Sequence, residues 1–478
     1  MLTFAGHAAS LARPLAFALF ARIHDAGALG ALFLIWTSVE LGARLATLGL
    51  DRGLRRWSDD DRAAATAAAL VISAVAGVAV AGVLIGVLPH LIALEAGAVW
   101  PARLVIGVSL PLLATGNVAL RAARGETQIA MYVLARAVVE PVLLLVAGVA
   151  LSLVLHGATA LLAGFLVSIA GGAVIAAVTV ARAIGPGRLL RALLQPGRWP
   201  LRELVPTSVP LGLADLLQSA QGKLDLMAVA LVTSSGAQAG AQIAGYAIAT
   251  ELVSGFTQVR QGYDQVIAPI AAELRGRRTD LVYLLTEGIR WNALFALPMA
   301  LALVVFPVPF LHLLGAPGDA AVVLVVLVIG RTVETVLGPA TSVITVVGHP
   351  QLALRAALIG VVLTVGGQLA LSAFGPEGIA VASSGGAIVA AVLATRWLAR
   401  RERLSPRWPA LAALIPVAAM LGGSLVGARL ALGMPHPAIL AAVMAAWLAG
   451  YVAIVVVRTR RSAAAADPAL PRALSLIA

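Results

Sequence analysis

The 478-residue sequence contains no cysteine, and only 12% of its residues are charged, against about 25% in a soluble globular domain. The absence of cysteine excludes disulfides, thiolate metal sites and cysteine nucleophiles. The shortage of charge excludes the three soluble domains of about 150 residues each that the length alone would allow. The chain is instead rich in apolar side chains, because 60% of its residues are hydrophobic. This composition indicates a membrane protein.

Long apolar runs alternate with short polar or Pro/Gly-rich breaks along the whole chain. A helix needs about 20 mostly apolar residues to cross the hydrocarbon core, where no water can satisfy the backbone. The first run contains His7 and Arg13, and we interpret it as a retained helix rather than a signal peptide. The runs predict an all-α polytopic fold with about fourteen transmembrane helices, at 5–21, 27–49, 64–88, 102–120, 131–155, 159–181, 205–232, 240–268, 284–306, 320–346, 352–373, 377–398, 409–431 and 437–457.

The 34 basic residues, of which only Lys223 is a lysine, are divided unevenly between alternate loops. With these spans, one side of the membrane receives 25 of them and the other receives three, namely Arg22, Arg103 and Arg429. Cytoplasmic loops retain arginine and lysine, so both termini are predicted to be cytoplasmic. The net charge of +12 is then explained mostly by the arginines that set the orientation in the membrane, and it does not indicate nucleic acid binding. These arginines are also expected to attract anionic membrane lipids.

The second half of the sequence resembles the first at an offset of about 220 residues. LPHLIALEAGAVWPARLVIG at 88–107 corresponds to VPFLHLLGAPGDAAVVLVVL at 308–327, and RGETQ at 124–128 corresponds to VGHPQ at 347–351. The constant order of these matches predicts two six-helix bundles related by a pseudo-two-fold repeat, as in many transporters. The predicted domains are an N-terminal bundle at 1–183, a basic cytoplasmic linker at 184–204, a C-terminal bundle at 205–400, and two extra helices with a cytoplasmic tail at 401–478.

Ionisable residues inside the spans are concentrated in four of them, at 27–49, 205–232, 240–268 and 320–346. Such residues are functional candidates, because placing a charge inside the bilayer costs free energy. We expect the spans at 27–49, 205–232 and 240–268 to line a central hydrated cavity. Arg260 and Lys223 suit an anionic group such as pyrophosphate, since arginine binds phosphate bidentately, and Gln258, Gln261 and Arg331 extend the polar stripes. The acids that can carry a proton or Na⁺ are Glu40, Asp215, Asp225, Glu251, Asp264 and Glu334.

Local pairing is the competing explanation for several of these charges. Glu40 with Arg44 is an i,i+4 pair in the favourable order, and Arg331 with Glu334 is an i,i+3 pair, so each pair can neutralise itself. Glu140, four residues after Arg136, is predicted to be structural or interfacial. Local pairing leaves acids over in the spans at 205–232 and 240–268, which favours a functional role there.

Catalysis by this chain is not expected. No loop exceeds roughly 25 residues, there is no Walker A motif, and the seven histidines have no metal-ligand spacing. The sequence therefore predicts no enzyme, no metal site and no cofactor.

Several passages resemble the multidrug/oligosaccharidyl-lipid/polysaccharide (MOP) exporter superfamily, in particular its polysaccharide and lipid-linked oligosaccharide flippases. They are AGALGALFLIWTSVELGARLATLGLDRGLRR at 26–56, AGYAIATELVSGFTQVRQGYDQVIAPIAAELRGRR at 244–278, FLHLLGAPGDAAVVLVVLVIGRTVETVLGPATSVITVVGHPQLALR at 310–355 and FGPEGIAVASSGGAIV at 374–389. The arrangement of twice six helices plus two also fits that superfamily.

The resemblance implies a flippase that moves a polyprenyl-pyrophosphate-linked sugar to the outer leaflet of a bacterial cytoplasmic membrane, by alternating access coupled to H⁺ or Na⁺. It matches Arg44 and Arg260, and more weakly Arg22, to cationic residues of the transport cavity. Other polysaccharide-assembly proteins are the expected partners. The rival interpretations are a cation-coupled multidrug antiporter of the same superfamily and a membrane polysaccharide polymerase or glycosyltransferase. A scaffold role is disfavoured by the polar spans.

Overall fold

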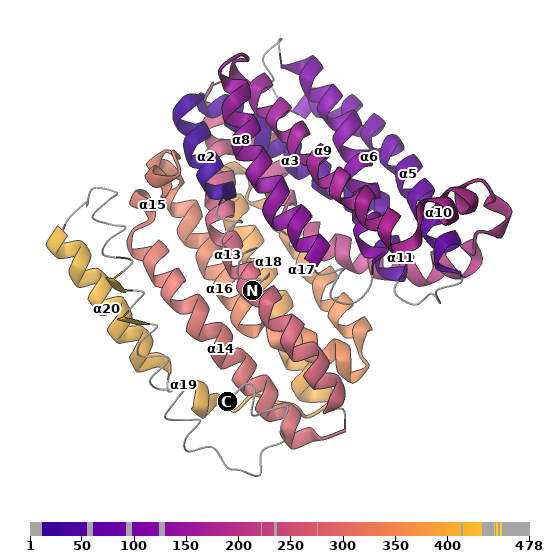
Figure 1. Cartoon of the computed structure of the whole chain (residues 1–478). Coiled ribbons are helices and arrows are strands. Elements are labelled where there is room, and N and C mark those ends of the chain that lie inside the picture. The colour runs from indigo at the N-terminus through magenta and orange to yellow at the C-terminus, as the bar shows by residue number, and fades with distance from the viewer. Residues whose placement is uncertain are drawn as a thin grey trace. The chain divides into compact units, whose positions relative to one another are not determined.

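The computed structural model describes residues 12–54, 61–91, 98–123, 130–220, 222–233, 237–274, 276–412 and 414–432, and a few residues between 444 and 451. Helices account for nearly all of this part of the chain, which contains no strand (Figure 1). The chain divides into two compact units. Unit 1 is Met1–Ile248 with Leu314–Ala316, and unit 2 is Ala249–Leu313 with Pro317–Ala478.

Unit 1 is built from helices that pack both on their neighbours in sequence and on helices further along the chain. They are α2 (Ala12–Ile23), α3 (Ala26–Thr47), α4 (Leu50–Gly53), α5 (Arg62–Leu91), α6 (Val99–Arg121), the π-helical η2 (Leu134–Val139), α8 (Glu140–Ser152), α9 (Gly157–Ile184), α10 (Pro186–Leu193), the short η3 (Pro196–Arg198), α11 (Leu201–Ala220), α12 (Leu224–Val232) and the start of α13 (Ala237–Glu273).

Aromatic rings and glycines set the helix contacts of unit 1. The ring of Phe17 on α2 lies 4.5 Å from that of Phe33 on α3, and Trp36 of α3 stacks on Phe165 of α9. α8 and α9 approach closely where Gly148 meets Gly164. A Cβ added at Gly164 would lie only 2.7 Å from the Cα of Gly148, so the contact requires glycine. Small residues allow such close backbone packing where no hydrophobic effect drives helices together in lipid.

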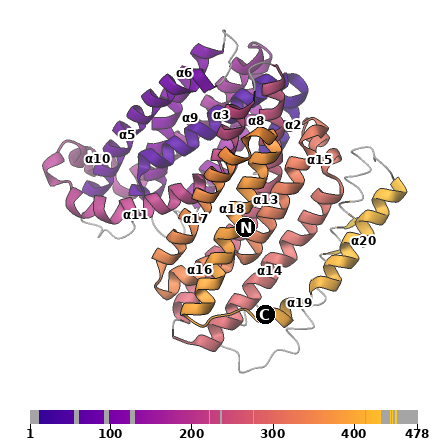
Figure 2. The same ribbon diagram turned by 180° about the vertical axis from the view of Figure 1, so that it is seen from behind.

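Unit 2 contains the rest of α13, α14 (Arg278–Val305), α15 (Pro307–Leu313), η4 (Gly318–Ala320), α16 (Ala321–Val347), α17 (Pro350–Ala370), η5 (Ser372–Phe374), α18 (Gly375–Arg401), α19 (Trp408–Ala412) and α20 (Leu414–Leu432). α18 lies against both α16 and α17, and α14 lies against α16 (Figure 2). At one end of these helices, Leu284 and Ile289 of α14, Val343 and Ile344 of α16 and Leu398 of α18 form a buried apolar cluster.

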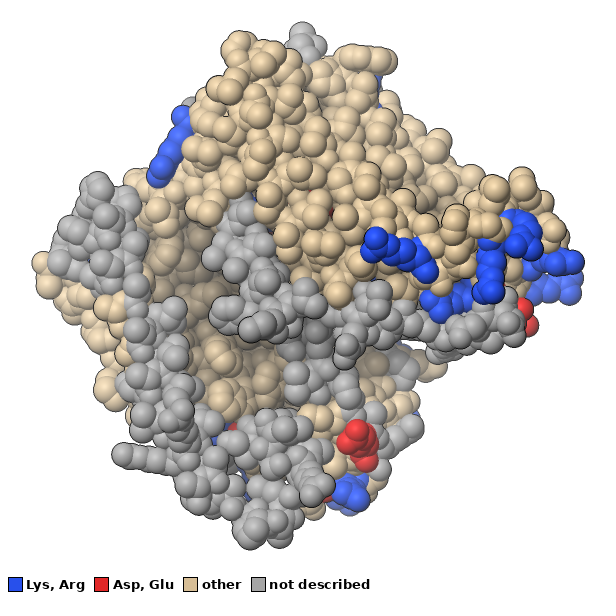
Figure 3. Space-filling model, viewed as in Figure 1, with Lys and Arg blue, Asp and Glu red and all other residues tan. Residues whose placement is uncertain are grey.

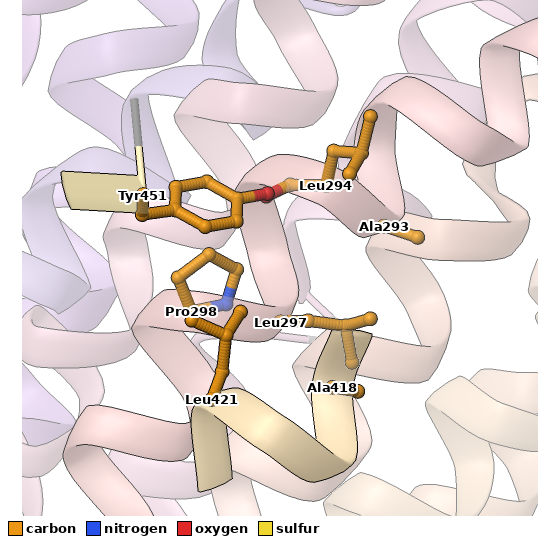
Figure 4. Close-up of a pocket in the computed structure, with 7 residues that line it drawn as sticks. All are labelled: Ala293, Leu294, Leu297, Pro298, Ala418, Leu421 and Tyr451. Carbon is orange, nitrogen blue, oxygen red and sulfur yellow. The ribbon is translucent and has the colours of Figure 1, made fainter. Parts of the chain in front are cut away.

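The C-terminal helices of unit 2 pack on α14 through both apolar and polar contacts. Arg429 of α20 donates to the carbonyl of Val305 at 2.6 Å, where it satisfies an end carbonyl of α14. The hydroxyl of Tyr451 donates to the carbonyl of Leu294. Tyr451 and residues of α14 and α20, including Pro298, line a small apolar hollow (Figure 4). One of the three arginines predicted on the outer side thus has a packing role.

Nine helices in the described part of the chain are long and apolar enough to cross a membrane. They fall on nine of the predicted spans, from Ala26–Thr47 to Ser372–Arg401, so a multi-pass α-helical fold is confirmed. The total of fourteen stays a prediction, and the last predicted span lies mostly outside the described residues. The prediction of one uninterrupted helix over 205–232 is wrong, because α11 ends at Ala220 and α12 begins at Leu224. The predicted repeat and domain boundaries stay predictions.

Candidate functional site

The interruption between α11 and α12 sets Lys223 at a helix break. The amides of Gly222 and Lys223 donate to the carbonyls of Ser219 and Ala220, at 3.3 and 3.0 Å, and close the last turn of α11. Lys223 then follows the C-terminal end of α11, which carries partial negative charge, and Asp225 lies in the first turn of α12, which carries partial positive charge. Lys223 and Asp225, which the sequence places in one polar span, therefore also stabilise the two helix ends at the break.

Lys223 donates to Glu40 of α3, so the first charged cluster of the protein joins two distant parts of the sequence within unit 1. The two side chains are 25% and 29% exposed, respectively. The sequence offered Arg44 as the nearest partner of Glu40, because the i,i+4 rule considers only one helix. Arg44 lies one turn further along α3 and is partly buried.

Glycine contacts at both ends of α3 position Glu40 against the break. Near the N-terminus of α3, a Cβ on Gly30 would lie 2.8 Å from the carbonyl oxygen of Gly240 on α13. Beyond its C-terminus, Gly49 has φ +74° and touches Gly212 of α11 so closely that neither position accommodates a side chain. Glu40 lies on α3 between these two close contacts. Because the contacts hold α3 against α11 and α13, the side chain of Glu40 can pair with Lys223.

The second charged cluster lies in unit 2, where α13 meets α16. Arg260 donates to Glu334 Oε1 at 2.8 Å, and Arg331 donates to Glu334 Oε2 at 2.7 Å. The three side chains are only 13%, 14% and 17% exposed, in the order Arg260, Arg331, Glu334. Two guanidinium groups thus share one carboxylate, and the three residues together carry a formal charge of +1. The i,i+3 pair expected from the sequence is observed, and Arg260 is its additional member.

Neighbouring residues hold Arg260 in place. A Cβ on Gly338 would lie 2.7 Å from Cδ of Arg260, so the stem of the arginine runs over this glycine. Asn292 of α14 donates to the carbonyl of Thr335 at 2.8 Å, and the hydroxyl of Thr335 donates to the carbonyl of Phe256 at 3.2 Å. These bonds fix α13, α14 and α16 around the cluster. In the described part of the chain, the Nε of Arg260 is buried and has no hydrogen-bond partner.

A third charged cluster lies in unit 1, where sequence reasoning expected only a structural or interfacial pair. Arg136, in the π-helical η2, donates to Glu140 and, at 2.6 Å, to Asn117 of α6. Glu140 is 8% exposed and lies against Gly172, where a Cβ would meet its carboxylate. The i,i+4 spacing predicted the ion pair, whereas the third partner comes from another helix. The cluster is balanced and links α6, α8 and α9, which favours the structural interpretation.

The remaining predicted site residues are dispersed. Asp225 is buried, Glu251 is partly buried on α13, and Gln258 and Arg22 are exposed. Asp215, Gln261 and Asp264 belong to helices α11 and α13, but their side chains lie outside the described part of the structure. No group of three or more acidic or histidine residues suited to a metal ion occurs among the described residues. Among the described site residues, the unit 2 cluster combines two arginines with one carboxylate, an arrangement suited to an anion.

Solved structures with the same fold are membrane transporters. The inward closed conformation of the lipid II flippase MurJ matches with a TM-score of 0.74 and 11% identity, over 96% of this chain and 99% of that chain. The inward-facing conformation of a multidrug resistance MATE family transporter matches with a TM-score of 0.60 and 16% identity, over 83% and 94% of the two chains. A MOP superfamily transporter from Pyrococcus furiosus matches with a TM-score of 0.57 and 18% identity, over 84% and 93%.

The fold is therefore that of the MOP superfamily of transporters, as the sequence resemblance predicts, and these structures are of transporters and a flippase rather than enzymes. No curated protein sequence matches the chain. A family described as polysaccharide biosynthesis protein matches residues 19–316, which is more than half of the sequence. The chain belongs to this polysaccharide biosynthesis protein family.

Proposed function

We propose that this protein is a flippase that moves a polyprenyl-pyrophosphate-linked oligosaccharide across the cytoplasmic membrane by alternating access. The transported glycan would serve the assembly of a cell-surface polysaccharide or of the cell wall. Three observations support the proposal: the family concerns polysaccharide biosynthesis, one structure with this fold is a lipid II flippase, and the fold is a multi-pass membrane fold.

The cluster of Arg260, Arg331 and Glu334 is the observation that carries the proposal. A flippase must offer its substrate's charged headgroup a counter-charge while the lipid tail stays in the bilayer. Two guanidinium groups on one carboxylate give a formal excess of one positive charge at a site of low exposure, where electrostatic attraction is strong. Arg260 also has a buried N–H that no described residue accepts. Arginine forks match phosphate oxygens bidentately.

Ion coupling belongs to other carboxylates in this proposal. Glu334 positions the two arginines, and Glu40 is paired with Lys223, so neither carboxylate needs to exchange an ion. Asp225 and Glu251 are the described acids that would carry H⁺ or Na⁺, and Asp215 and Asp264 are the further candidates from the sequence. Substitution of the coupling acid by its amide would make transport independent of the ion gradient or abolish it.

The proposed setting is a bacterial cytoplasmic membrane with both termini in the cytoplasm. The excess of arginine in one set of loops supports this orientation. Proteins that polymerise or ligate the exported glycan are the expected partners. Fusion of a reporter that is active only in the cytoplasm to either terminus tests the orientation, and an inactive reporter at both ends would contradict it.

The decisive substitution is Arg260→Gln in cells that depend on this protein for glycan export. We expect the lipid-linked glycan to accumulate on the inner leaflet, with at least about a tenfold loss of export, because a charged hydrogen bond contributes about 1.5–3 kcal/mol. Arg290→Gln is the matched control, since Arg290 is also in a membrane helix and pairs with a glutamate, Glu287, but its own side chain is 40% exposed and the contact is longer, at 3.4 Å. Full export by Arg260→Gln at normal protein abundance would overturn the assignment.

The structural likeness to a multidrug transporter supports a second candidate function, a cation-coupled drug antiporter. A cationic drug needs carboxylates, so Glu251→Gln rather than Arg260→Gln would be the damaging substitution. Resistance of cells to cationic compounds, measured for both variants, separates the two functions. Drug resistance that depends on Glu251 and ignores Arg260 would replace the flippase proposal.

A further inference from the structure

The segment between α9 and α11 combines clustered positive charge with exposed apolar side chains. It contains five arginines, at 182, 188, 191, 198 and 202, all of them exposed, and a single acid, Glu203, follows them. Leu190 and Leu194 are 59% and 72% exposed. Figure 3 shows basic side chains gathered where α10 and the start of α11 lie. We call residues 182–202 the α10 segment.

The α10 segment is packed in place along one side. Gly185, with φ +89°, makes the turn from α9 that an L side chain would resist, and α10 then lies against α5 and α9. Leu189 packs on the buried cluster around Val180. Trp199 donates from Nε1 to the carbonyl of Ala192 at 2.9 Å. The exposure of the two leucines on the other side is thus a property of a fixed helix.

The exposed residues of α10 have the order of an interfacial helix. Leu190 and Leu194 are one turn apart on one face, and Arg188 and Arg191 are one turn apart on the adjoining face. Helices of this kind lie in the headgroup layer, with their apolar face toward the acyl chains and their basic residues among the headgroups. The start of α5 and the end of α9 lie beside α10, because Ala63, Ile184 and Leu189 belong to one apolar cluster. The distribution of arginine predicts that these ends face the cytoplasm.

We propose that the α10 segment binds anionic phospholipid at the cytoplasmic face of the membrane. Arg188, Arg191 and their flanking arginines would contact the headgroups, while Leu190 and Leu194 enter the acyl boundary. The charge fits anionic lipid, toward which basic segments beside a span are attracted. The exposed leucines favour a membrane surface over a soluble acidic protein. The inference goes beyond the proposed function, because it needs no particular transported substrate.

The absence of native cysteine makes the test direct, because one introduced cysteine can be labelled uniquely. Leu194→Cys in the full chain is labelled with an environment-sensitive dye and placed in nanodiscs of phosphatidylcholine alone or of phosphatidylcholine with phosphatidylglycerol. We expect a blue-shifted emission and quenching by lipids that carry a shallow nitroxide, both stronger with phosphatidylglycerol and weakened by salt. Thr279→Cys, exposed at the start of α14, is the control and should show neither effect.

Removing the charge separates lipid binding from a general effect of labelling. In the double variant Arg188→Gln/Arg191→Gln, the response of the Leu194 label to phosphatidylglycerol should fall at least severalfold while the thermal unfolding temperature is retained. Arg400→Gln/Arg401→Gln removes equal charge from exposed positions at the end of α18 and should leave the response intact. A water-exposed label in both nanodiscs, an equal response to both lipids, or shielding only by an added acidic protein would overturn the proposal.

Discussion

The two charged clusters that contain predicted site residues differ in their balance of charge. In unit 1, one lysine meets one glutamate, Lys223 and Glu40, and the pair is neutral. In unit 2, Arg260 and Arg331 share Glu334, so these three residues contribute two guanidinium groups and one carboxylate. A neutral pair fixes two helices together and gains little from a ligand. A cluster with more guanidinium than carboxylate is completed by an anion, so it is the better binding site.

Exposure separates the clusters as well. The side chains of the unit 1 pair are about twice as exposed, at 25% and 29%, as those of the unit 2 cluster, at 13% to 17%. A poorly exposed carboxylate that compensates two cations is therefore expected to matter more for stability than the more exposed Glu40 of the unit 1 pair.

The largest effect is expected for Glu334→Gln. Its loss leaves two poorly exposed guanidinium groups without their shared carboxylate, and breaking such a buried arrangement costs about 3–5 kcal/mol. Thermal unfolding in detergent should show a clearly lowered midpoint and transport should be lost. The comparison variant Glu287→Gln breaks the pair with Arg290, whose side chain is 40% exposed, and should cost at most about 1 kcal/mol. Equal midpoints for the two variants would contradict the ranking.

An exchange of charges sharpens the comparison between the clusters. Glu40→Lys and Lys223→Glu should each reduce transport, whereas the double variant should recover much of it, with a coupling energy of about 0.5–3 kcal/mol. The same exchange at Arg260 and Glu334 should fail to recover transport, because Arg331 would then face a lysine or arginine in place of the carboxylate. Transport by the singles and doubles at equal abundance is the measurement. Recovery in unit 2 would show that the cluster acts as a simple pair.

A smaller effect is expected for Gly338→Ala. The added methyl group would lie within 3 Å of Arg260 Cδ and Cγ, so the arginine must shift, and overpacking of this kind costs about 1–3 kcal/mol. Partial loss of transport should accompany it. Gly366→Ala in α17 is the matched control, because no atom lies within 4 Å of the added Cβ. If both variants transport equally, the position of Arg260 tolerates displacement and its geometry is not critical.

Sequence pattern predicted the features that repeat along one helix. The apolar runs of α5 and α9 predict membrane spans, because length and apolar composition are sufficient to identify a span. The i,i+3 and i,i+4 spacings predicted the ion pairs of Arg331 with Glu334 and of Arg136 with Glu140. The resemblance to the MOP superfamily also predicted the fold that the solved structures confirm.

Contacts between helices were beyond such reasoning. Arg260 is 74 residues from Glu334, and Asn117 is 19 residues from Arg136, and helical periodicity contains no information about which helices meet. The sequence does not predict the break before Lys223, because the polar residues beside it, among them Lys223 and Asp225, are equally consistent with a continuous helix that lines a cavity. Gly222 was the available signal, yet an isolated glycine is common in membrane helices that do not break.

Transport by purified protein tests the central claim most directly, that Arg260 recognises the pyrophosphate of a lipid-linked glycan. Proteoliposomes containing the native chain, Arg260→Gln or Arg290→Gln are loaded with a fluorescent polyprenyl-pyrophosphate oligosaccharide, and its appearance on the other leaflet is followed with a membrane-impermeant glycan-binding probe. We expect translocation by the native and Arg290→Gln proteins and a rate near that of empty liposomes for Arg260→Gln. Equal rates for all three proteins would contradict the claim.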